Sequence, residues 1–534
     1  MCQDGTGGHS LKQGIFFALK SLGRNRIQLF LIGTLALGGL LRLYGIRFGL
    51  PELWHPDEDA VVMPALEILR TGEWQPIRME YGSFHIYILT AISAVVTVLL
   101  MRDGHISSAS EIPIYARGTF PSIYHQEEFF VAARFVSVVT GTLTILIIFL
   151  LARRLTDSPR QALLAGLFTA ILPRFVVHSH FATTDMSLMF WITVALYLLL
   201  RVYDNWESDS WWSYAGAGIV CGIATSTKYN GVLLMLPLLS VALLRVKSLE
   251  RVVSWRTISG AVGMIVGFLA STPYVVLALP EFLDWFGFSL RLYNLPTDKP
   301  VTSMAWHLDY HLRQSYAPLF LLAFIGIPLS FWKWKWRGFA LNIFAFVFWF
   351  TIFQQTNSQV RMWLPTAPVV ILWSVLTLDT FFEFVYQRFE TNRHVKWFPY
   401  IVTILIATPM LLSAARIAHD LSYDGRLTAR VWIEDNIAEG TSVAVDYLRP
   451  NIDPERWSVT NTFFLYDNDL QWYQERGVEY LVLHDAINDF DRQDIGRREQ
   501  YETFVAQLCL VHQLREPTLG YYYTIFIYHM PPCS

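Results

Sequence analysis

Charged residues are scarce in this sequence, and their scarcity excludes whole classes of protein. Asp, Glu, Lys and Arg make up 16% of the 534 residues, whereas 53% are hydrophobic and the mean hydropathy is +0.34. A chain this apolar is not an ordinary soluble protein and is typical of a polytopic membrane protein. The net charge is −3 and the sequence shows no basic patch interleaved with aromatic residues, so nucleic acid is not an expected partner.

Cysteine is also rare. The chain has four cysteines, too few for a disulfide framework. Cys221 falls in an apolar segment, where packing accounts for it. Cys509 and Cys533 lie in the C-terminal region and can pair if that region faces an oxidising compartment; the sequence leaves this open.

The N-terminal segment lacks the features of a cleavable signal peptide. Residues 1–28 are polar and basic, and the apolar run Leu29–Tyr44 is expected to be an uncleaved signal anchor. Basic residues such as Lys20 and Arg24 precede this run, so the positive-inside rule places residues 1–28 in the cytoplasm. The loop at residues 47–128 is then external.

The same rule bears on the apolar run Ser83–Leu100. If this run crosses the membrane, Arg153 and Arg154 fall on the outside, against the rule. If it stays in the outer interface, the basic clusters of the later loops face the cytoplasm. We therefore predict that it stays outside and that the chain has about eleven spans across a hydrocarbon core of about 30 Å. The predicted spans lie near residues 29–46, 130–151, 161–177, 186–202, 212–227, 230–245, 258–277, 316–332, 338–355, 364–382 and 398–415.

An odd number of spans leaves the C-terminal region outside, and the composition changes there. Thr428–Ile437 has the pattern of an amphipathic helix, while Ser442–Tyr447 and Tyr480–His484 have the patterns of strands. We therefore expect a transmembrane domain at residues 29–418 and an external soluble α/β domain at residues 419–534. The latter contains no GxGxxG, CxxC, GxSxG or P-loop motif, which favours a lid or docking module.

The first external loop carries the motif Trp54-His55-Pro56-Asp57-Glu58-Asp59. Acids at a membrane surface are stable only in water or in pairs, so an unused cluster is costly. Proline suits the first turn of a helix and acids suit its positive N-terminal end, so a short interfacial helix is predicted at about residues 57–70. A solvated acidic N-cap is the alternative to a functional site.

Polar residues from many segments share the external membrane boundary in this topology. A lipid phosphate there needs arginine or lysine, and a hydroxyl or amine acceptor needs a carboxylate base. A channel would need a ring of like groups, and a secondary transporter would need polar groups near the midplane of a repeat; the sequence shows neither. The gathered residues are Asp57, Glu58, Glu80, Arg134, His178, His180, Asp185, Lys228, Tyr229, His307, Arg313 and Arg361.

Several segments, in order along nearly the whole chain, carry a resemblance to a known family. They are Trp54–Asp59 with Gly72-Glu73-Trp74, Ala132–Phe135, Pro173–Asp185, Gly222–Tyr229, Arg361–Pro368 and Ala429–Gly440. With them the chain resembles the lipid-carrier-dependent glycosyltransferases of the GT-C fold, in particular the protein O-mannosyltransferase and aminoarabinose-transferase superfamily. Tyr81-Gly82-Ser83-Phe84 stands where the aminoarabinose branch has a Lys-Pro-Pro stretch, which counts against lipid A as the acceptor.

The resemblance implies a reaction at the external, periplasmic face of the plasma membrane. A sugar would move from a polyprenyl phosphate to a hydroxyl or amine acceptor on a glycan, a lipid or a protein. Asp57 would take the acceptor proton, and Glu58 would support it or cap the helix. Asp185 would be a second acid that contacts the acceptor or a metal, or else the N-cap of the span that follows it.

Cations and aromatic residues complete the expected site. Arg134, Lys228 and Arg361 would hold the donor phosphate, unless their side chains only reach to the interface. A divalent cation is an open alternative to structural or sugar-contacting histidines, and no other cofactor is implied. The ligands of that cation would be Asp185, His178 and His180. The expected sugar or acceptor contacts are Trp54, His55, His178, His180 and Tyr229.

Two other functions are compatible with a multi-pass chain of this kind. One is a transporter or flippase for lipid-linked glycans, which the loop acids and the external domain disfavour. The other is a non-catalytic scaffold of the same fold, which an intact Asp57 with cations around it disfavours.

Overall fold

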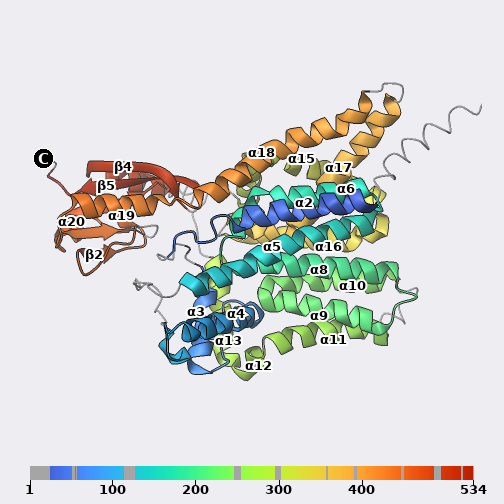
Figure 1. Ribbon diagram of the computed structural model, residues 1–534, viewed down its shortest axis with the longest axis horizontal. Helices are drawn as coiled ribbons and strands as arrows, with labels where there is room; N and C mark the ends of the chain where they lie inside the picture. The colour runs from blue at the N-terminus through green and yellow to red at the C-terminus, as the bar shows by residue number, and fades with distance from the viewer. Residues whose placement is uncertain are drawn as a thin grey trace, which may run out of the picture.

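The protein is a bundle of helices with a small α/β domain at one end (Figure 1). The last long helix of the bundle, α18 (Phe398–Asp420), leads directly into that domain. The computed structural model describes residues 24–50, 55, 57–112, 127–245, 254–294, 302–356, 359–389, 394–446, 450–485, 495–518 and 521–532.

Each predicted span overlaps a helix, although the spans predicted at 161–177, 230–245 and 258–277 are each divided between two shorter helices. A backbone in lipid has to satisfy its own hydrogen bonds, and a helix does so within one apolar segment. Besides α18, these helices are α2 (Arg24–Leu43), α5 (Glu127–Thr156), α6 (Pro159–Ile171), α8 (Thr184–Asp204), α9 (Trp211–Thr227), α10 (Met235–Arg245), α11 (Trp255–Ser271), α15 (Ala317–Lys333), α16 (Phe339–Gln354) and α17 (Ala367–Arg388).

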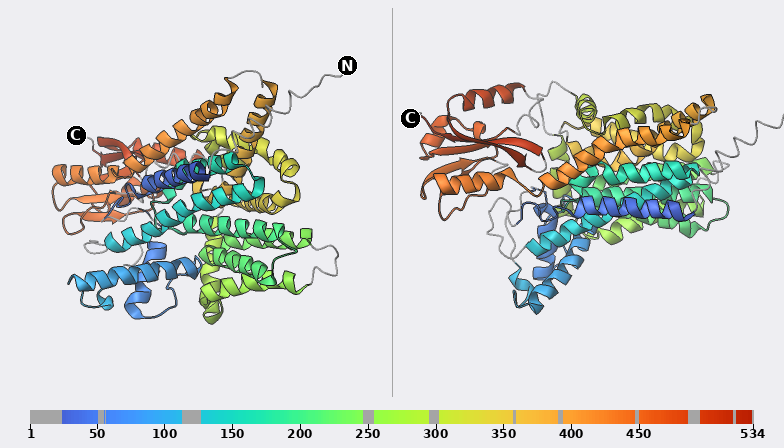
Figure 2. Two further views of the ribbon diagram at one scale, coloured as in Figure 1. Left: turned by 45° about the vertical axis from the view of Figure 1, so that its right-hand side comes forward. Right: turned by 45° about the horizontal axis from the view of Figure 1, so that its top comes forward.

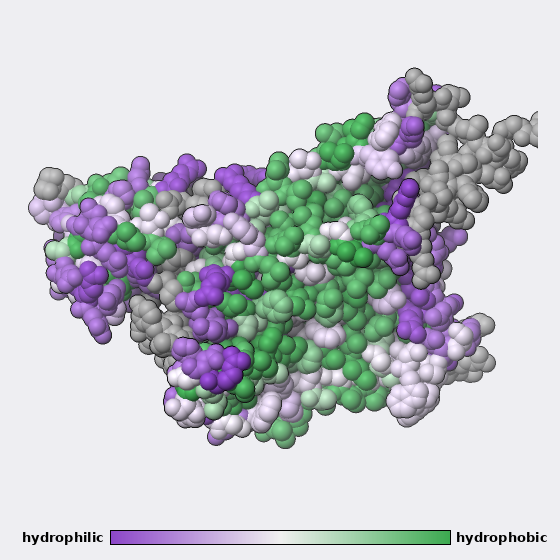
Figure 3. Space-filling model, in the orientation of Figure 1, coloured by the Kyte–Doolittle hydropathy of each residue, from purple (hydrophilic) through white to green (hydrophobic). Residues whose placement is uncertain are grey.

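The surface of the bundle is suited to lipid. Seven of the described helices are long and apolar enough to cross a membrane, and α4 (Ser83–Arg102) is among them. On the face shown in Figure 3, apolar side chains cover the middle of the bundle and polar side chains cover its ends. The protein is therefore a multi-pass membrane protein. The count of about eleven spans and the placement of α4 outside the membrane stay predictions, because helix length and composition alone do not decide them.

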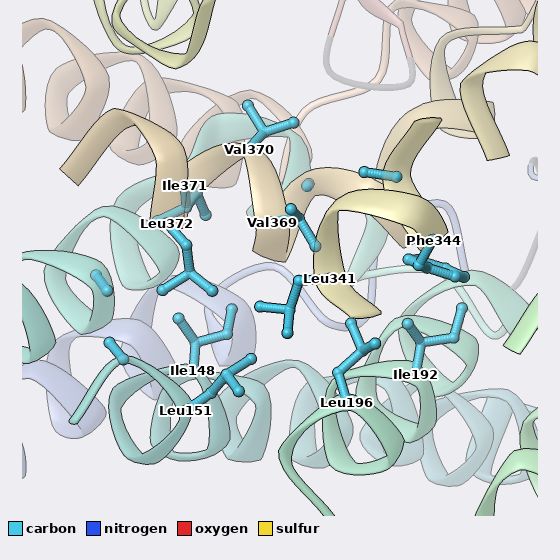
Figure 4. Close-up of a cluster of buried hydrophobic side chains, with 14 of the residues drawn as sticks. Ile148, Leu151, Ile192, Leu196, Leu341, Phe344, Val369, Val370, Ile371 and Leu372 are labelled. Carbon is cyan, nitrogen blue, oxygen red and sulfur yellow. The ribbon is translucent and has the colours of Figure 1, made fainter. Parts of the chain in front are cut away.

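Close packing of helix faces holds the bundle together. Ile148 of α5, Ile192 of α8 and Leu341 of α16 are buried in one apolar cluster and point toward one another (Figure 4). Helices α9 and α11 approach each other through glycines, and a Cβ atom on Gly218 would lie 2.1 Å from the carbonyl oxygen of Gly260. Small residues allow such contacts between membrane helices, whose association depends on packing rather than on exclusion of water.

The loop after α2 forms a short helix next to its acidic motif, close to the predicted bounds. Helix α3 (Asp59–Thr71) ends at Gly72, whose φ of 77° is a conformation that glycine adopts without strain. Helices α3 and α4 share an apolar cluster and lie beside the half of the bundle nearest the α/β domain (Figure 2). The other short helices of the bundle and its loops are η1 (Ala109–Glu111), α7 (Pro173–His178), η2 (Tyr229–Leu234), α12 (Tyr274–Leu277), α13 (Leu279–Tyr293), α14 (Ser303–Leu312), η4 (Lys335–Gly338), η5 (Val360–Thr366) and η6 (Val395–Trp397).

The α/β domain is built on a five-stranded sheet with the order β2-β1-β3-β5-β4. Strand β1 runs parallel to β2 and β3, and β5 runs antiparallel to β3 and β4. Strands β1 and β3 coincide with two segments in which the sequence predicts strands, whereas the edge strands β2 and β4 are not predicted, because both are rich in polar residues. The elements are α19 (Gly425–Asn436), β1 (Ser442–Val445), β2 (Ser458–Asn461), η7 (Leu465–Asp467), α20 (Leu470–Gln474), β3 (Tyr480–His484), α22 (Ile495–Val505), β4 (Cys509–Thr518) and β5 (Tyr521–His529).

The two described cysteines differ in their bonding state: Cys221 is free and Cys509 is disulfide-bonded. Cys221 is a buried free thiol in α9. Cys509 at the start of β4 is disulfide-bonded, which fits a domain exposed to an oxidising compartment. Cys533, and residues 1–23 of the predicted cytoplasmic tail, lie outside the described residues.

A cysteine at Ser107, which is exposed after α4, should react with an impermeant thiol reagent added to intact cells. The reason is that the charge pattern keeps residues 83–112 on the external side. A cysteine at the exposed Ser208, in the predicted cytoplasmic loop after α8, is the matched control and should react only after permeabilisation. Protection of Ser107 in intact cells would overturn this topology. Ser122, a second position suited to this test, lies outside the described residues.

Candidate active site

Four charged side chains of alternating sign lie in a row beside the first loop. Asp57, in the turn before α3, is ion-paired with Arg361 of η5. The Nη1 atom of Arg361 lies 3.9 Å from Oδ2 of Asp185 in the first turn of α8. Nζ of Lys228, just after α9, donates a 2.9 Å hydrogen bond to Oδ1 of Asp185. We call these four residues the charge row; all four are site residues predicted from the sequence, and the fold brings them together from distant parts of the chain.

Helix ends explain why two of these groups are stable where they lie. Asp185 is in the first turn of α8, where the helix dipole favours negative charge, and Lys228 follows the last turn of α9, where it favours positive charge. The N-cap of α8 is Thr183, and its side chain forms no capping hydrogen bond. Asp185 is therefore not the N-cap; its carboxylate pairs across helices.

Exposure decreases along the charge row from Asp57 to Asp185 and rises again at Lys228, which is 15% exposed. The Asp57 side chain is 27% exposed, Arg361 is 16% exposed and Asp185 is 6% exposed, so Asp57 is the carboxylate most accessible to a substrate. Burial raises the pKa of Asp57, but the Arg361 guanidinium and His55 outweigh burial and hold the pKa below its ordinary value. The Asp57 carboxylate is therefore ionised at neutral pH.

Two tyrosines that the sequence does not single out belong to this site. The ring of Tyr81 lies 5.6 Å from Nζ of Lys228, and its phenol interacts electrostatically with Asp57 and Arg361. Burial, and then Asp57, raise the pKa of Tyr81 well above its ordinary value, so the phenol keeps its proton. Tyr293, at the end of α13, interacts electrostatically with both Tyr81 and Arg361. The departure from the family pattern at residues 81–84 is the one sequence signal that points toward Tyr81.

Glu58 and Arg134 form a separate, fully buried ion pair, and neither side chain has any exposed surface. Nε and Nη2 of Arg134 donate 2.7 Å hydrogen bonds to the two carboxylate oxygens of Glu58, and Nη1 donates to the carbonyls of Ile46 and Phe48. The backbone N–H of Ala182 also donates to Glu58. Arg134 is occupied by these bonds and does not snorkel, and Glu58 makes no capping hydrogen bond in α3. We assign both residues to the fold rather than to phosphate or acceptor binding.

The predicted histidines have different surroundings. Both ring nitrogens of His180 lie against backbone carbonyls, those of Val176 at 2.8 Å and Tyr44 at 2.7 Å, so this side chain fastens two segments together. His178, at the end of α7, is buried and its Nε2 has no hydrogen-bond partner among the described residues. His55 accepts a 3.2 Å hydrogen bond at Nδ1 from the backbone of Asp57 and so shapes the acidic turn.

The metal alternative finds no support in this geometry. In the described part of the chain, no three His, Cys, Asp or Glu side chains are grouped so that they could hold a metal ion. Asp185, His178 and His180 therefore do not converge on one point.

Two aromatic residues, Tyr229 and Trp54, are predicted to contact the sugar or the acceptor, and the structure shows a structural role for Tyr229. The hydroxyl of Tyr229 donates to the carbonyls of Met79 at 2.9 Å and Tyr81 at 3.0 Å, which ties η2 to the first loop. Its ring packs against aromatic side chains of α13. Trp54 lies outside the described residues.

Comparison with known proteins agrees with the fold. Residues 112–294 match the family model of the dolichyl-phosphate-mannose-protein mannosyltransferases. In overall structure the chain is similar to ArnT from Cupriavidus metallidurans, with a TM-score of 0.54 and 14% identity over 95% of this chain and 98% of that one. The chain therefore has the fold of the GT-C glycosyltransferases, and the predicted resemblance to that superfamily is confirmed.

Curated relatives match over shorter stretches. An undecaprenyl phosphate-α-4-amino-4-deoxy-L-arabinose arabinosyl transferase of Pseudomonas fluorescens is 25% identical over 258 residues, which are 47% of this chain. A polyprenol-phosphate-mannose–protein mannosyltransferase of Corynebacterium glutamicum is 28% identical over 120 residues, which are 18% of this chain and 23% of that protein. The chain spans 42% of the length of the first of these relatives, so the activity itself is argued below from the site.

Glu58→Gln should destabilise the protein by about 3–5 kcal/mol, because it leaves the Arg134 guanidinium buried without a counter-charge. Thermal unfolding of the purified protein in detergent measures this loss. The exposed pair of Arg47 and Glu127 provides the matched control. Glu127→Gln should cost less than about 1 kcal/mol, as surface ion pairs do. Equal unfolding temperatures for the two variants would contradict the structural assignment of Glu58.

Proposed function

We propose that the protein is a membrane glycosyltransferase that moves a sugar from a polyprenyl-phosphate donor to a hydroxyl or amine acceptor at the external face of the plasma membrane. The observation that carries this proposal is the charge row. Arg361 lies between Asp57 and Asp185, and Lys228 pairs with Asp185 from another side. The row lies at the end of the bundle that meets the first loop. Arginine and lysine in a partly dry site suit a phosphate, and an ionised carboxylate suits proton abstraction.

The donor phosphate would bind Arg361 and Lys228 in place of the carboxylates that they contact now. Asp57 would then lose its ion pair with Arg361 and become free to accept a proton. The acceptor O–H or N–H would give its proton to Asp57 while the acceptor atom attacks the anomeric carbon. The bond from that carbon to the phosphate oxygen would break, and the two cations would hold the negative charge of the released polyprenyl phosphate.

The names of the matched relatives support this class of donor. Both curated relatives are named for transfer from an undecaprenyl or polyprenol phosphate sugar, and the family model is named for dolichyl-phosphate-mannose. Asp185 would orient the substrates or the cations beside it. The α/β domain, reached directly from α18 and carrying a disulfide-bonded cysteine, would lie on the external side and dock or cover the acceptor.

The experiment that tests the class of function is reconstitution in vesicles with a polyprenyl-phosphate sugar. Mass spectrometry of glycolipids, glycans and glycoproteins from cells with and without the gene then identifies the product. Loss of one glycoconjugate with the gene, and its formation by the reconstituted protein, supports the proposal. Movement of an unaltered lipid-linked sugar across the vesicle membrane would show a flippase, and no chemical change in either experiment would show a scaffold.

Asp57→Asn should slow transfer by roughly 10²–10⁴-fold, because the amide keeps the size of the side chain but does not accept a proton. Folding and donor binding should remain. In the ligand-free protein Arg361 holds the pKa of Asp57 below its ordinary value, so kcat/KM of the parent, which reports the free enzyme, should be insensitive to this group near pH 7 and should fall only as acid protonates the carboxylate. Turnover of purified Asp57→Asn close to that of the parent would remove Asp57 from the chemistry.

Arg361→Ala should raise the apparent KM for the donor lipid more than that for the acceptor. The lost contact is a charge-assisted hydrogen bond to phosphate, worth about 1.5–3 kcal/mol, or roughly tenfold to 150-fold in affinity. Steady-state kinetics with one substrate varied at a time separates the two effects. Arg313→Ala, which removes an exposed pair with Asp309, is the matched control and should change neither constant. A normal donor KM in Arg361→Ala would exclude a phosphate contact.

A further inference from the structure

Lys228 has a second neighbour besides Asp185, the aromatic ring of Tyr81. The Nζ atom of Lys228 lies over this ring, 5.6 Å from its centre. An ammonium is attracted to an aromatic face within about 6 Å of the ring centre. Tyr81 is half-buried and comes from the loop before α4, whereas Lys228 follows α9, so the contact joins two segments that are distant in the sequence.

The backbone at Tyr81 is held against the end of α9. The hydroxyl of Tyr229 donates a 3.0 Å hydrogen bond to the carbonyl of Tyr81. Gly82 lies so close to α9 that a Cβ atom on it would overlap the carbonyl oxygen of Ser226, so a larger residue would push the two segments apart. Because Ser226 precedes Lys228 by two residues, these contacts keep the ring and the ammonium together.

The two neighbours of Lys228 respond differently to a bound donor. Asp185 accepts a 2.9 Å hydrogen bond from Nζ, and in the proposed reaction the donor phosphate takes the place of this carboxylate. An ammonium has three N–H donors, so the ring can stay beside it while one oxygen partner replaces another. The ring of Tyr81 is therefore the neighbour that Lys228 keeps throughout.

We propose that Tyr81 is a positioning residue of the donor site, whose ring holds the Lys228 ammonium at the donor phosphate when Asp185 gives up its hydrogen bond. The inference rests on the proposed function, in which Lys228 binds that phosphate. A bound lipid phosphate excludes water from the row. The attraction between a cation and a ring at least doubles when both are shielded from water, so the contact favours the donor-bound state.

The ring, and not the hydroxyl, has this role. Burial, and then Asp57, raise the pKa of Tyr81 well above its ordinary value, so the side chain brings no negative charge to Lys228. A phenolate would compete with the phosphate for the ammonium, whereas a neutral ring attracts the ammonium without taking the place of the phosphate.

Equilibrium binding of polyprenyl phosphate to the purified full-length protein tests the inference without requiring turnover. Tyr81→Leu keeps an apolar side chain but removes the aromatic face. Its affinity should fall by about five- to tenfold, the difference between a shielded and an exposed contact of this kind. Tyr81→Phe keeps the ring and should bind as the parent does.

Tyr203→Leu is the matched control. The ring of Tyr203 is also partly buried and lies 4.5 Å from Cζ of Arg245, but at the end of α8 opposite to Asp185. Removal of this ring should leave the affinity for polyprenyl phosphate unchanged.

A double-mutant cycle shows whether the ring acts through Lys228. Lys228→Met removes the ammonium and keeps most of the side-chain volume. If the ring acts only on that ammonium, Tyr81→Leu should cause no further loss of affinity in the Lys228→Met protein. A ring that only supports the fold would cause the same loss in both proteins.

Three results would overturn the inference. The first is an unchanged affinity in Tyr81→Leu, and the second is an equal loss in Tyr81→Phe, which would assign the effect to the hydroxyl. The third is an equal loss from Tyr81→Leu with and without Lys228. A parent protein that gives the expected binding pattern but transfers no sugar would refute the proposed function and leave the inference intact.

Discussion

The buried ion pair between Glu58 and Arg134 is the constraint on which the site depends. It joins the loop before α3 to α5, and its further bonds reach the chain after α2 and the turn before α8. Two charges without exposed surface are stable only when they satisfy each other, so the loop has one way to dock. Because Asp57 precedes Glu58 directly, fixing one carboxylate in the interior directs the other toward Arg361.

The charge row is also held together by pairing of opposite charges, but it lies at a less buried place than the pair of Glu58 and Arg134. Three of its members are partly exposed and Asp185 is buried, and the ligand-free arrangement is neutral, since each carboxylate has a cation beside it. In the proposed mechanism the substrate phosphate would replace the Asp57 carboxylate at Arg361, and the displaced carboxylate is the more exposed of the two in the row. The exchange leaves Asp57 as a free base only when the donor is present, which would protect the acceptor site from premature proton transfer.

Sequence patterns predicted the parts of the structure that depend on local chemistry. Apolar runs of sufficient length become helices because a lipid-exposed backbone has no other partner, and acids with a proline before them begin α3. The polar edge strands β2 and β4 do not show the apolar pattern that predicts a strand. Their pairing depends on neighbouring strands in the sheet rather than on their own residues. The same holds for Tyr81, whose ring lies beside Lys228, a residue distant in the chain.

By itself the sequence determined that the chain crosses a membrane and that Asp57, Asp185, Lys228 and Arg361 share one of its faces. Only the tertiary structure decided which charges pair. Asp57 and Glu58 are adjacent and chemically alike, yet one meets Arg361 at a partly open surface and the other meets Arg134 in the interior. Charge pairing depends on distance and burial, and these are set by how helices from opposite ends of the chain pack, which no local pattern encodes.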